Sequence, residues 1–120
     1  MLHAHRVESS AFDRPLDLVH LARQTLGDRS VEREVLAIFR RQARQVLFQL
    51  EALTDPGNRL EIAHALNGSA KGVGAWRVAT AAEALETASR AGIASGEAVA
   101  ALAESISEVC GEIDELLTEG

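Results

Sequence analysis

Apolar residues recur at the helical period through almost all of the chain after Pro15, and this pattern constrains the fold more than any other feature. Glycines, prolines and helix-capping side chains divide the pattern into five segments. The segments predict helices over about residues 13–27, 31–53, 56–73, 75–91 and 96–117. Because the connections are short, consecutive helices are expected to be antiparallel neighbours. The sequence therefore predicts an all-α fold, an antiparallel four-helix bundle with an additional short N-terminal helix.

Local patterns add detail to each segment. Ser30 is the expected N-cap of the second helix, and Trp76 is expected to pack across the bundle end between the third and fourth helices. Cys110 falls beside the apolar seam of the last helix and is expected to pack as a small core residue. The first segment is expected to turn one apolar face inward, formed by Leu16, Val19, Ala22 and Leu26.

The composition agrees with packed helices and excludes several classes of protein. Of the 120 residues, 47% are hydrophobic but only 3% aromatic, and there is no Tyr, unlike the composition of sheet proteins. The net charge of −6 argues against a general nucleic-acid binder and against an electrostatic membrane binder. With no export signal, no long apolar run and a single cysteine, we expect a cytoplasmic, monomeric protein. We expect a flexible N-terminus over residues 1–12 and one domain over residues 13–120.

The third predicted helix departs from the pattern of the others, because Gly68, Gly72 and Gly74 lie in or near its second half. Each glycine inside a helix costs about 1 kcal/mol relative to alanine, and local rules are most often broken where function requires it. The helical period places His64 away from the apolar stripe, with Gly68 one turn further on and Lys71 two turns further on. The sequence thus predicts an exposed histidine beside a bare patch of helix.

An exposed imidazole has an ordinary pKa of about 6.5, so one ring nitrogen is available as a nucleophile at neutral pH. It can attack a phosphoryl group and hold it as a phosphoramidate, with a nearby cation or amide stabilising the oxygens in flight. The helix supplies neither a metal nor an acid to hydrolyse the product, which suits a carrier better than a phosphatase. Two plainer interpretations remain open: a surface histidine without chemistry, and glycines that serve as helix–helix contacts.

The residues from His64 to Ala70 (His-Ala-Leu-Asn-Gly-Ser-Ala), with Gly74 ten residues after the histidine, resemble the signature of histidine phosphotransfer (HPt) domains. That signature is His-x-Leu-Lys-Gly-Ser/Ala. The stretch from Gly74 to Ala79 resembles the stand-alone bacterial type. The resemblance covers nearly the whole chain. It implies a phosphoprotein of a two-component phosphorelay that carries a phosphoryl group on His64 between aspartates of receiver domains.

The resemblance also implies partners and site roles. The partners would be response-regulator receiver domains and a (hybrid) sensor histidine kinase, with Mg²⁺ held by the receiver and no cofactor or metal in this chain. Glu86, twenty-two residues after the histidine, matches the Gln or Glu that orients Nδ1 in many members. Asn67 replaces the usual Lys, so Lys71 becomes a candidate for the missing charge. The candidate phosphoryl contacts are therefore Lys71, Asn67 and Ser69, and the candidate receiver-docking residues are Gly68, Leu60, Ala65, Glu61 and Gly72.

Two other kinds of protein share features with this sequence. Glu61 and His64 have the Glu-x-x-His spacing of di-iron bundles, but those need a second such motif, and the chain has none. The arginines Arg40, Arg41 and Arg44 could line the docking face, although solvated surface is the favoured interpretation. The alternative function is a catalytically silent bundle that binds response regulators or self-associates. The pairing of His64 with Gly68 favours the carrier, because a purely structural module needs no exposed nucleophile.

Overall fold

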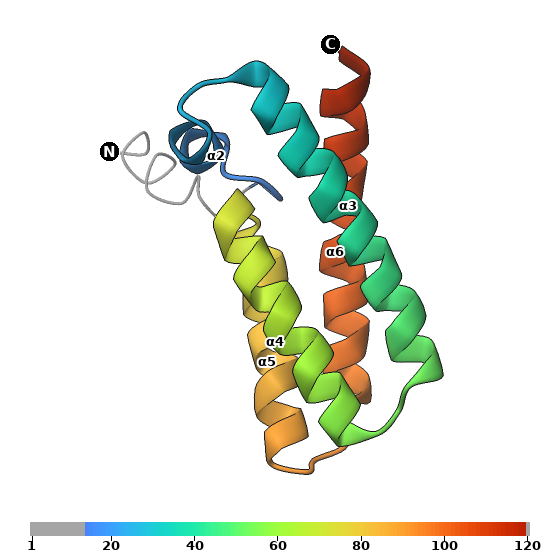
Figure 1. The fold of residues 1–120 in the computed structure, drawn as a ribbon. Coiled ribbons are helices and arrows are strands. Elements are labelled where there is room, and N and C mark those ends of the chain that lie inside the picture. The colour runs from blue at the N-terminus through green and yellow to red at the C-terminus, as the bar shows by residue number, and fades with distance from the viewer. Residues whose placement is uncertain (1–13, 120) are drawn as a thin grey trace, which may run out of the picture.

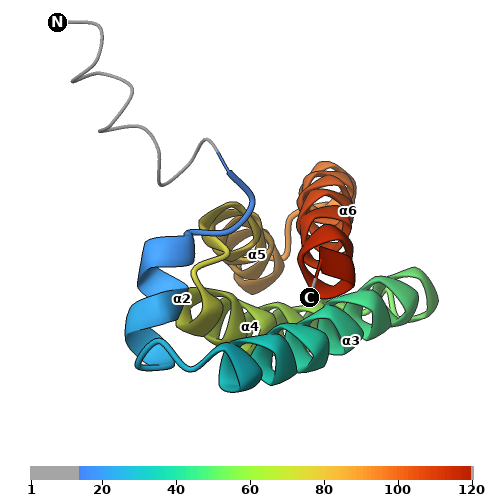
Figure 2. The ribbon, with the colours of Figure 1, turned by 90° about the horizontal axis from the view of Figure 1, so that it is seen from above.

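The computed structural model describes residues 14–119, and five α-helices follow one another within them. They are α2 (Leu18–Gln24), α3 (Arg29–Ala52), α4 (Pro56–Val73), α5 (Trp76–Arg90) and α6 (Gly96–Glu119). The four long helices run alternately in opposite directions, and α2 lies across one end of them (Figure 1). Helices α3 and α5 each pack against both α4 and α6, which closes the bundle (Figure 2). The predicted all-α bundle with an additional short N-terminal helix is confirmed. The predicted flexible segment, residues 1–12, lies outside the described residues.

The ends of the helices follow the capping residues, with one correction. The side chain of Asp55 caps α4 by accepting from the backbone N–H of Asn58, and Gly74 ends α4 in the left-handed conformation with φ of 84°. The cap of α3 is Asp28 rather than the predicted Ser30. The Asp28 carboxylate accepts from the N–H groups of Ser30 and Val31 at 2.9 and 3.1 Å, so the helix begins before Ser30.

The predicted inward face of the first helix is wrong in part. Leu16 is buried, but the side chains of Val19 and Leu26 are exposed, to 63% and 93%. Helix α2 ends at Gln24, and Leu26 adopts a positive φ of 55°, so it leaves the helix before the apolar face can continue. A helix of seven residues is too short for a periodic pattern to determine which side faces the core.

The core runs along the axis of the bundle. Cys110 is part of it, as predicted, and burial is the main cause of the raised pKa of its thiol. Small side chains, including Ala63, Ala70 and Ala82, are fully buried on α4 and α5 and let these two helices pack closely. The largest fully buried side chains are Leu16, Leu21, Leu50, Leu66, Leu85, Leu102, Ile106, Ile113, Val78 and Val109.

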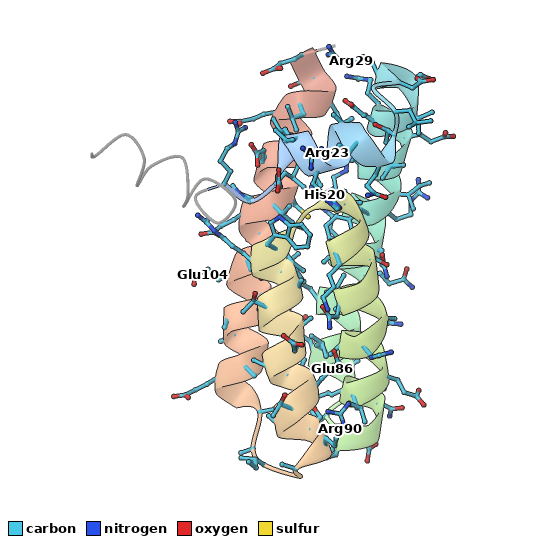
Figure 3. All side chains as sticks on the ribbon, turned by 90° about the vertical axis from the view of Figure 1, so that its left-hand side faces the viewer. His20, Arg23, Arg29, Glu86, Arg90 and Glu104 are labelled. Atoms are coloured by element: carbon cyan, nitrogen blue, oxygen red, sulfur yellow. The ribbon has the colours of Figure 1, made fainter. Side chains whose placement is uncertain are left out.

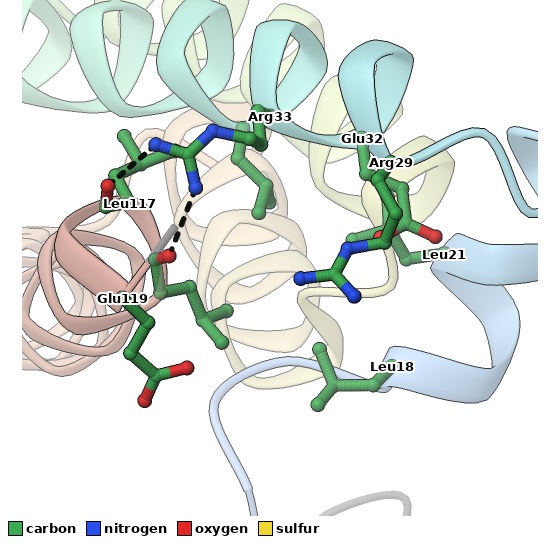
Figure 4. Close-up of a pocket in the computed structure, with 9 residues that line it drawn as sticks. Leu18, Leu21, Arg29, Glu32, Arg33, Leu117 and Glu119 are labelled. Carbon is green, nitrogen blue, oxygen red and sulfur yellow. Dashed lines mark hydrogen bonds between the residues drawn. The ribbon is translucent and has the colours of Figure 1, made fainter.

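Arginine side chains of α3 lie at the end of the bundle that carries α2. Arg33 of α3 donates to the carbonyl oxygens of Leu116 and Leu117, which satisfies part of the C-terminus of α6. Beside it lies a cavity of about 250 Å³ between α2, α3 and α6. Figure 4 shows the side chain of Arg29 extending into this cavity near Leu18. At this end of the molecule, Arg33 therefore links α3 to the last turns of α6.

None of the helices within residues 14–119 combines the length and hydropathy that a membrane crossing needs. Over the same residues, no group of three or more His, Cys, Asp or Glu side chains is arranged to hold a metal ion.

Candidate functional site

Helix α4 presents His64 to solvent because its other faces are occupied by packing. Ala63, Leu66 and Ala70 point into the core, whereas the side chain of His64 is 77% exposed. The helix continues without interruption through Gly68 and Gly72. A Cβ atom at either glycine would meet nothing within 4 Å. These two glycines therefore do not mediate helix–helix contacts among the described residues, and they leave a bare surface beside the histidine.

The exposed histidine is held by a buried carboxylate on the next helix. Glu86 of α5 is only 6% exposed, and its Oε2 lies 2.8 Å from Nδ1 of His64. The close packing of α4 on α5 brings the two residues together. Because the ring is otherwise largely exposed, the geometry holds Nδ1 and leaves Nε2, on the opposite side of the ring, toward solvent.

A second side chain of α4 reaches the same carboxylate. The amide nitrogen Nδ2 of Asn67 donates to Oε1 of Glu86 at 3.0 Å, and Asn67 is only 8% exposed. Arg90, one turn further along α5, brings its Nη2 to 3.7 Å from Oε2 of Glu86. Figure 3 shows Glu86 and Arg90 on the same stretch of α5, in the half of the bundle away from α2. The two oxygens of Glu86 therefore have different partners.

The electrostatics keep this carboxylate ionised. Burial alone would raise the pKa of Glu86, but the hydrogen bonds from His64 and Asn67, the charge that His64 carries when it is protonated and the charge of Arg90 outweigh it and lower the pKa. An ionised carboxylate only accepts hydrogen bonds, so Nδ1 of His64 must carry the proton that faces it. Nε2 of the neutral ring is then unprotonated and faces solvent, which is the state of a nucleophile.

The other predicted site residues are distributed around the exposed face of α4. Lys71 and Gly72 are exposed two turns after His64, and Leu60 is half-buried before it. Glu61 and Ala65 are exposed. The hydroxyl of Ser69 donates to the carbonyl of Ala65 in its own helix at 3.3 Å, and Ser69 borders a groove between α3 and α4. The structure thus groups His64, Asn67 and Glu86 by direct hydrogen bonds, whereas the roles of Lys71, Asn67 and Ser69 as phosphoryl contacts stay predictions.

Arg40 and Arg44 of α3 face a different helix, whereas Arg41 is exposed. Arg40 and Arg44 both form ion pairs with Asp114 of α6, at 2.6 and 3.1 Å. Sequence reasoning also missed Arg90, although a position four residues after Glu86 on one helix face is a recognisable signal. It missed the contact between Asn67 and Glu86 as well, since that contact depends on which side of α4 is covered by α5.

These features together define a class of protein: a helical bundle that holds one oriented, largely exposed histidine against a buried carboxylate. Comparison with models of known families gives the particular family. Residues 34–119 match the model of the Hpt domain, and the chain belongs to this family. The match covers α3 from residue 34 and all of α4, α5 and α6, and it leaves α2 outside. Comparisons with curated proteins and with solved structures gave no match.

Membership of this family carries a function at the level of the family. Hpt domains take part in histidine phosphotransfer in phosphorelays and interact with kinases and receiver domains of two-component systems. The match does not separate the stand-alone bacterial type from other members, and that part of the resemblance stays a prediction.

Proposed function

We propose that this chain is a phosphoryl carrier that receives a phosphoryl group on Nε2 of His64 from the aspartate of one receiver domain and passes it to another. One observation carries the proposal: a 77% exposed imidazole whose Nδ1 lies 2.8 Å from the buried carboxylate of Glu86. The exposed nitrogen can be reached by a partner's active site, while the other nitrogen is occupied. A surface histidine without a function needs no such partner.

In the transfer step, phosphorus exchanges a bond to oxygen for a bond to nitrogen. The lone pair of Nε2 attacks the phosphorus of an aspartyl phosphate, and the P–N bond forms as the P–O bond breaks. The electron pair of that bond leaves with the aspartate as a carboxylate. Because Nδ1 keeps its proton, the phosphorylated ring is positively charged, and the ionised Glu86 stabilises this charge. The same charged ring is a good leaving group when the next aspartate attacks, so transfer is reversible.

The partner supplies what this chain does not. In the proposal the receiver domain brings the Mg²⁺ and the acidic cluster that transfer requires, and this chain is a carrier rather than an enzyme. The bare surface at Gly68 and Gly72, flanked by Leu60, Glu61 and Ala65, is the docking site. Lys71 supplies the positive charge that the family motif places at position 67. The carrier acts as a cytoplasmic monomer with one domain over residues 13–120.

The test is phosphotransfer from a panel of receiver domains, each phosphorylated on its aspartate. The wild type is expected to gain a phosphate that is labile to acid and stable to base, and His64→Gln is expected to gain none. His5→Gln, the same substitution elsewhere in the chain, is the matched control and should still be labelled. Lys71→Ala in the same assay should slow transfer without abolishing it. If the receivers bind but none transfers its phosphate, the chain is a silent scaffold.

A further inference from the structure

Asn67 is a buried polar residue that is only half satisfied. It is 8% exposed, its Nδ2 donates to Oε1 of Glu86 at 3.0 Å, and its Oδ1 is buried with no hydrogen-bond partner among the described residues. The orientation of the amide follows from chemistry, because an ionised carboxylate has no proton to donate and only the NH₂ group can face it. The carbonyl oxygen of the amide must then point the other way and stay unpaired.

An unpaired buried oxygen of this kind destabilises the fold, because it gives up its hydrogen bonds to water and gains none in return. A leucine has a similar size and would fill the same place between α4 and α5 without that cost. The packing of α4 on α5 therefore does not by itself explain an asparagine at this position. The contact with Glu86 is what the asparagine adds.

That contact determines how the carboxylate of Glu86 is turned. Asn67 holds Oε1 while His64 lies against Oε2, so both donors come from α4 and each uses a different oxygen. A glutamate side chain has three rotatable torsions, and without Asn67 its polar contacts are all on Oε2, from the largely exposed side chains of His64 and Arg90, which do not by themselves hold it in a single orientation. With Asn67 in place, rotation of the carboxylate would break a buried hydrogen bond.

The orientation matters because of the intrinsic preference of imidazole. A free neutral histidine side chain favours the tautomer with the proton on Nε2, which is the nitrogen that must be unprotonated to attack phosphorus. The partner of Nδ1 selects the opposite tautomer. Any loosening of Glu86 therefore returns the proton to the attacking nitrogen.

We infer that Asn67 is a positioning residue, which holds the carboxylate of Glu86 so that His64 keeps its proton on Nδ1 and presents Nε2 as the nucleophile. This inference rests on the proposed function, since the tautomer matters only if Nε2 is the atom that reacts. It gives Asn67 a role through Glu86 in place of the direct contact with phosphoryl oxygens that the family motif suggested. Asn67 then fixes the orientation of the Glu86 carboxylate, whereas the lysine of the family motif supplies a positive charge at this position.

The test measures the tautomer of His64 in the unphosphorylated full chain by ¹⁵N NMR of the imidazole ring. The signals of His64 are assigned by their loss in His64→Gln, and spectra are taken at about pH 8.5, above the ordinary imidazole pKa of about 6.5. In the wild type the Nδ1–H form should dominate. In Asn67→Leu the ratio of Nδ1–H to Nε2–H should fall about tenfold, the lower end of what loss of an outer hydrogen-bond partner costs in other sites.

Two controls separate positioning from general damage. Ser89→Ala removes a buried hydroxyl of α5 that, like Oδ1 of Asn67, has no hydrogen-bond partner among the described residues, and it should leave the ratio unchanged. In a Glu86→Leu background, adding Asn67→Leu should change nothing further, because Asn67 acts only through Glu86. Asn67→Ala, a good helix former, provides the same test if the leucine variant fails to fold.

The inference is overturned if His64 keeps the wild-type ratio in Asn67→Leu and Asn67→Ala, or if the effect persists without Glu86. These outcomes are read without any transfer of phosphate. A chain that shows the expected tautomers but is never phosphorylated would contradict the proposed function and leave the role of Asn67 in place. Normal phosphotransfer together with an unchanged tautomer ratio in the Asn67 variants would contradict the role of Asn67 and leave the proposed function in place.

Discussion

Two carboxylates in this molecule, those of Glu86 and Asp17, each accept a hydrogen bond from the ring nitrogen of another side chain, but the consequences differ. Glu86 of α5 accepts a hydrogen bond from the ring of His64 on α4, and Asp17, just before α2, accepts one from the indole Nε1 of Trp76 on α5 at 3.0 Å. Each has a second donor on its other oxygen: the side chain of Asn67 for Glu86, and the backbone N–H of His20 for Asp17. In each case the hydrogen bonds contribute to a lowered pKa of the carboxylate.

The difference lies in the ring that each carboxylate holds. The imidazole of His64 has a second nitrogen on its exposed side, whereas an indole has no further nitrogen. Trp76 is also half-buried, and its ring packs edge-on against the ring of His20, with 4.9 Å between the ring centroids. The same interaction therefore prepares a reactive atom at one place and joins two helices at the other. An oriented aromatic N–H is a functional sign only when the rest of the ring is both reactive and accessible.

The two regions also use glycine for opposite reasons. At Gly68 a Cβ atom would meet nothing, so the glycine leaves room for something outside the chain. At Gly74 a Cβ atom would lie 3.0 Å from the carbonyl oxygen of Asp17, and the N–H of Asp17 donates to the carbonyl of Gly74 at 2.9 Å. Gly74 is therefore needed by the joint between α2 and the turn from α4 to α5.

The largest effects should come from exchanging the two carboxylates for apolar residues. Glu86→Leu is expected to lower the rate of phosphotransfer to His64 about 100-fold, since the wrong tautomer then prevails. Asp17→Ala should leave that rate unchanged but lower the free energy of unfolding by about 2 kcal/mol, because it removes the cap of α2 and the bond to Trp76. Transfer assays and chemical unfolding of both variants measure the contrast. Equal losses of transfer in the two variants would show that the regions are coupled.

The two glycines should respond in opposite directions to the same substitution. Gly74→Ala is expected to lower the free energy of unfolding by about 2 kcal/mol, because a positive φ of 84° and a backbone clash must both be accommodated. Gly68→Ala should raise it by up to about 1 kcal/mol, as expected for an open position inside a helix. Denaturant midpoints give both values. A destabilised Gly68→Ala would mean that this surface is already packed against something.

The smallest effect is a dependence of stability on pH. A lowered pKa means that ionised Asp17 favours the folded state, so its contribution is present above its unfolded pKa of about 3.9 and is lost as the pH falls through the folded value. Asp17→Asn keeps one capping acceptor, but it removes the charge and replaces the other oxygen with an NH₂ group that cannot accept from Trp76, so it should cost about 1 kcal/mol at neutral pH. The difference in unfolding free energy from wild type should shrink steadily below about pH 4. If the difference stays constant down to acid pH, the charge of Asp17 does not contribute to the stability of the fold.

Local sequence was sufficient for much of the fold. The apolar period and the capping residues placed α4 over residues 56–73 and the other long helices within a few residues of their ends. The exposure of His64 followed from the same period, because Leu66 and Ala70 define the buried side of the helix. These features depend on neighbours within one or two turns, which a sequence pattern records directly.

Other features depended on how the elements meet. Period alone could not place Leu26, because α2 ends at Gln24 and the chain leaves it with a positive φ. It could not show that Arg40 and Arg44 turn toward Asp114 of α6. For the two arginines the deciding partner lies 70 or more residues away in the sequence, so that no local pattern contains it.

The sequence by itself determined the helices, the exposed histidine and, through the spacing of a known motif, the identity of the residue opposite it. Only the tertiary structure decided that Asn67 is buried against Glu86 rather than exposed beside His64. Asn67 lies at the edge between the exposed and covered faces of α4, and the position and crossing of α5 determine on which side of that edge it falls. Helical periodicity gives the angle of a side chain around its own axis, but burial depends on where the next helix packs.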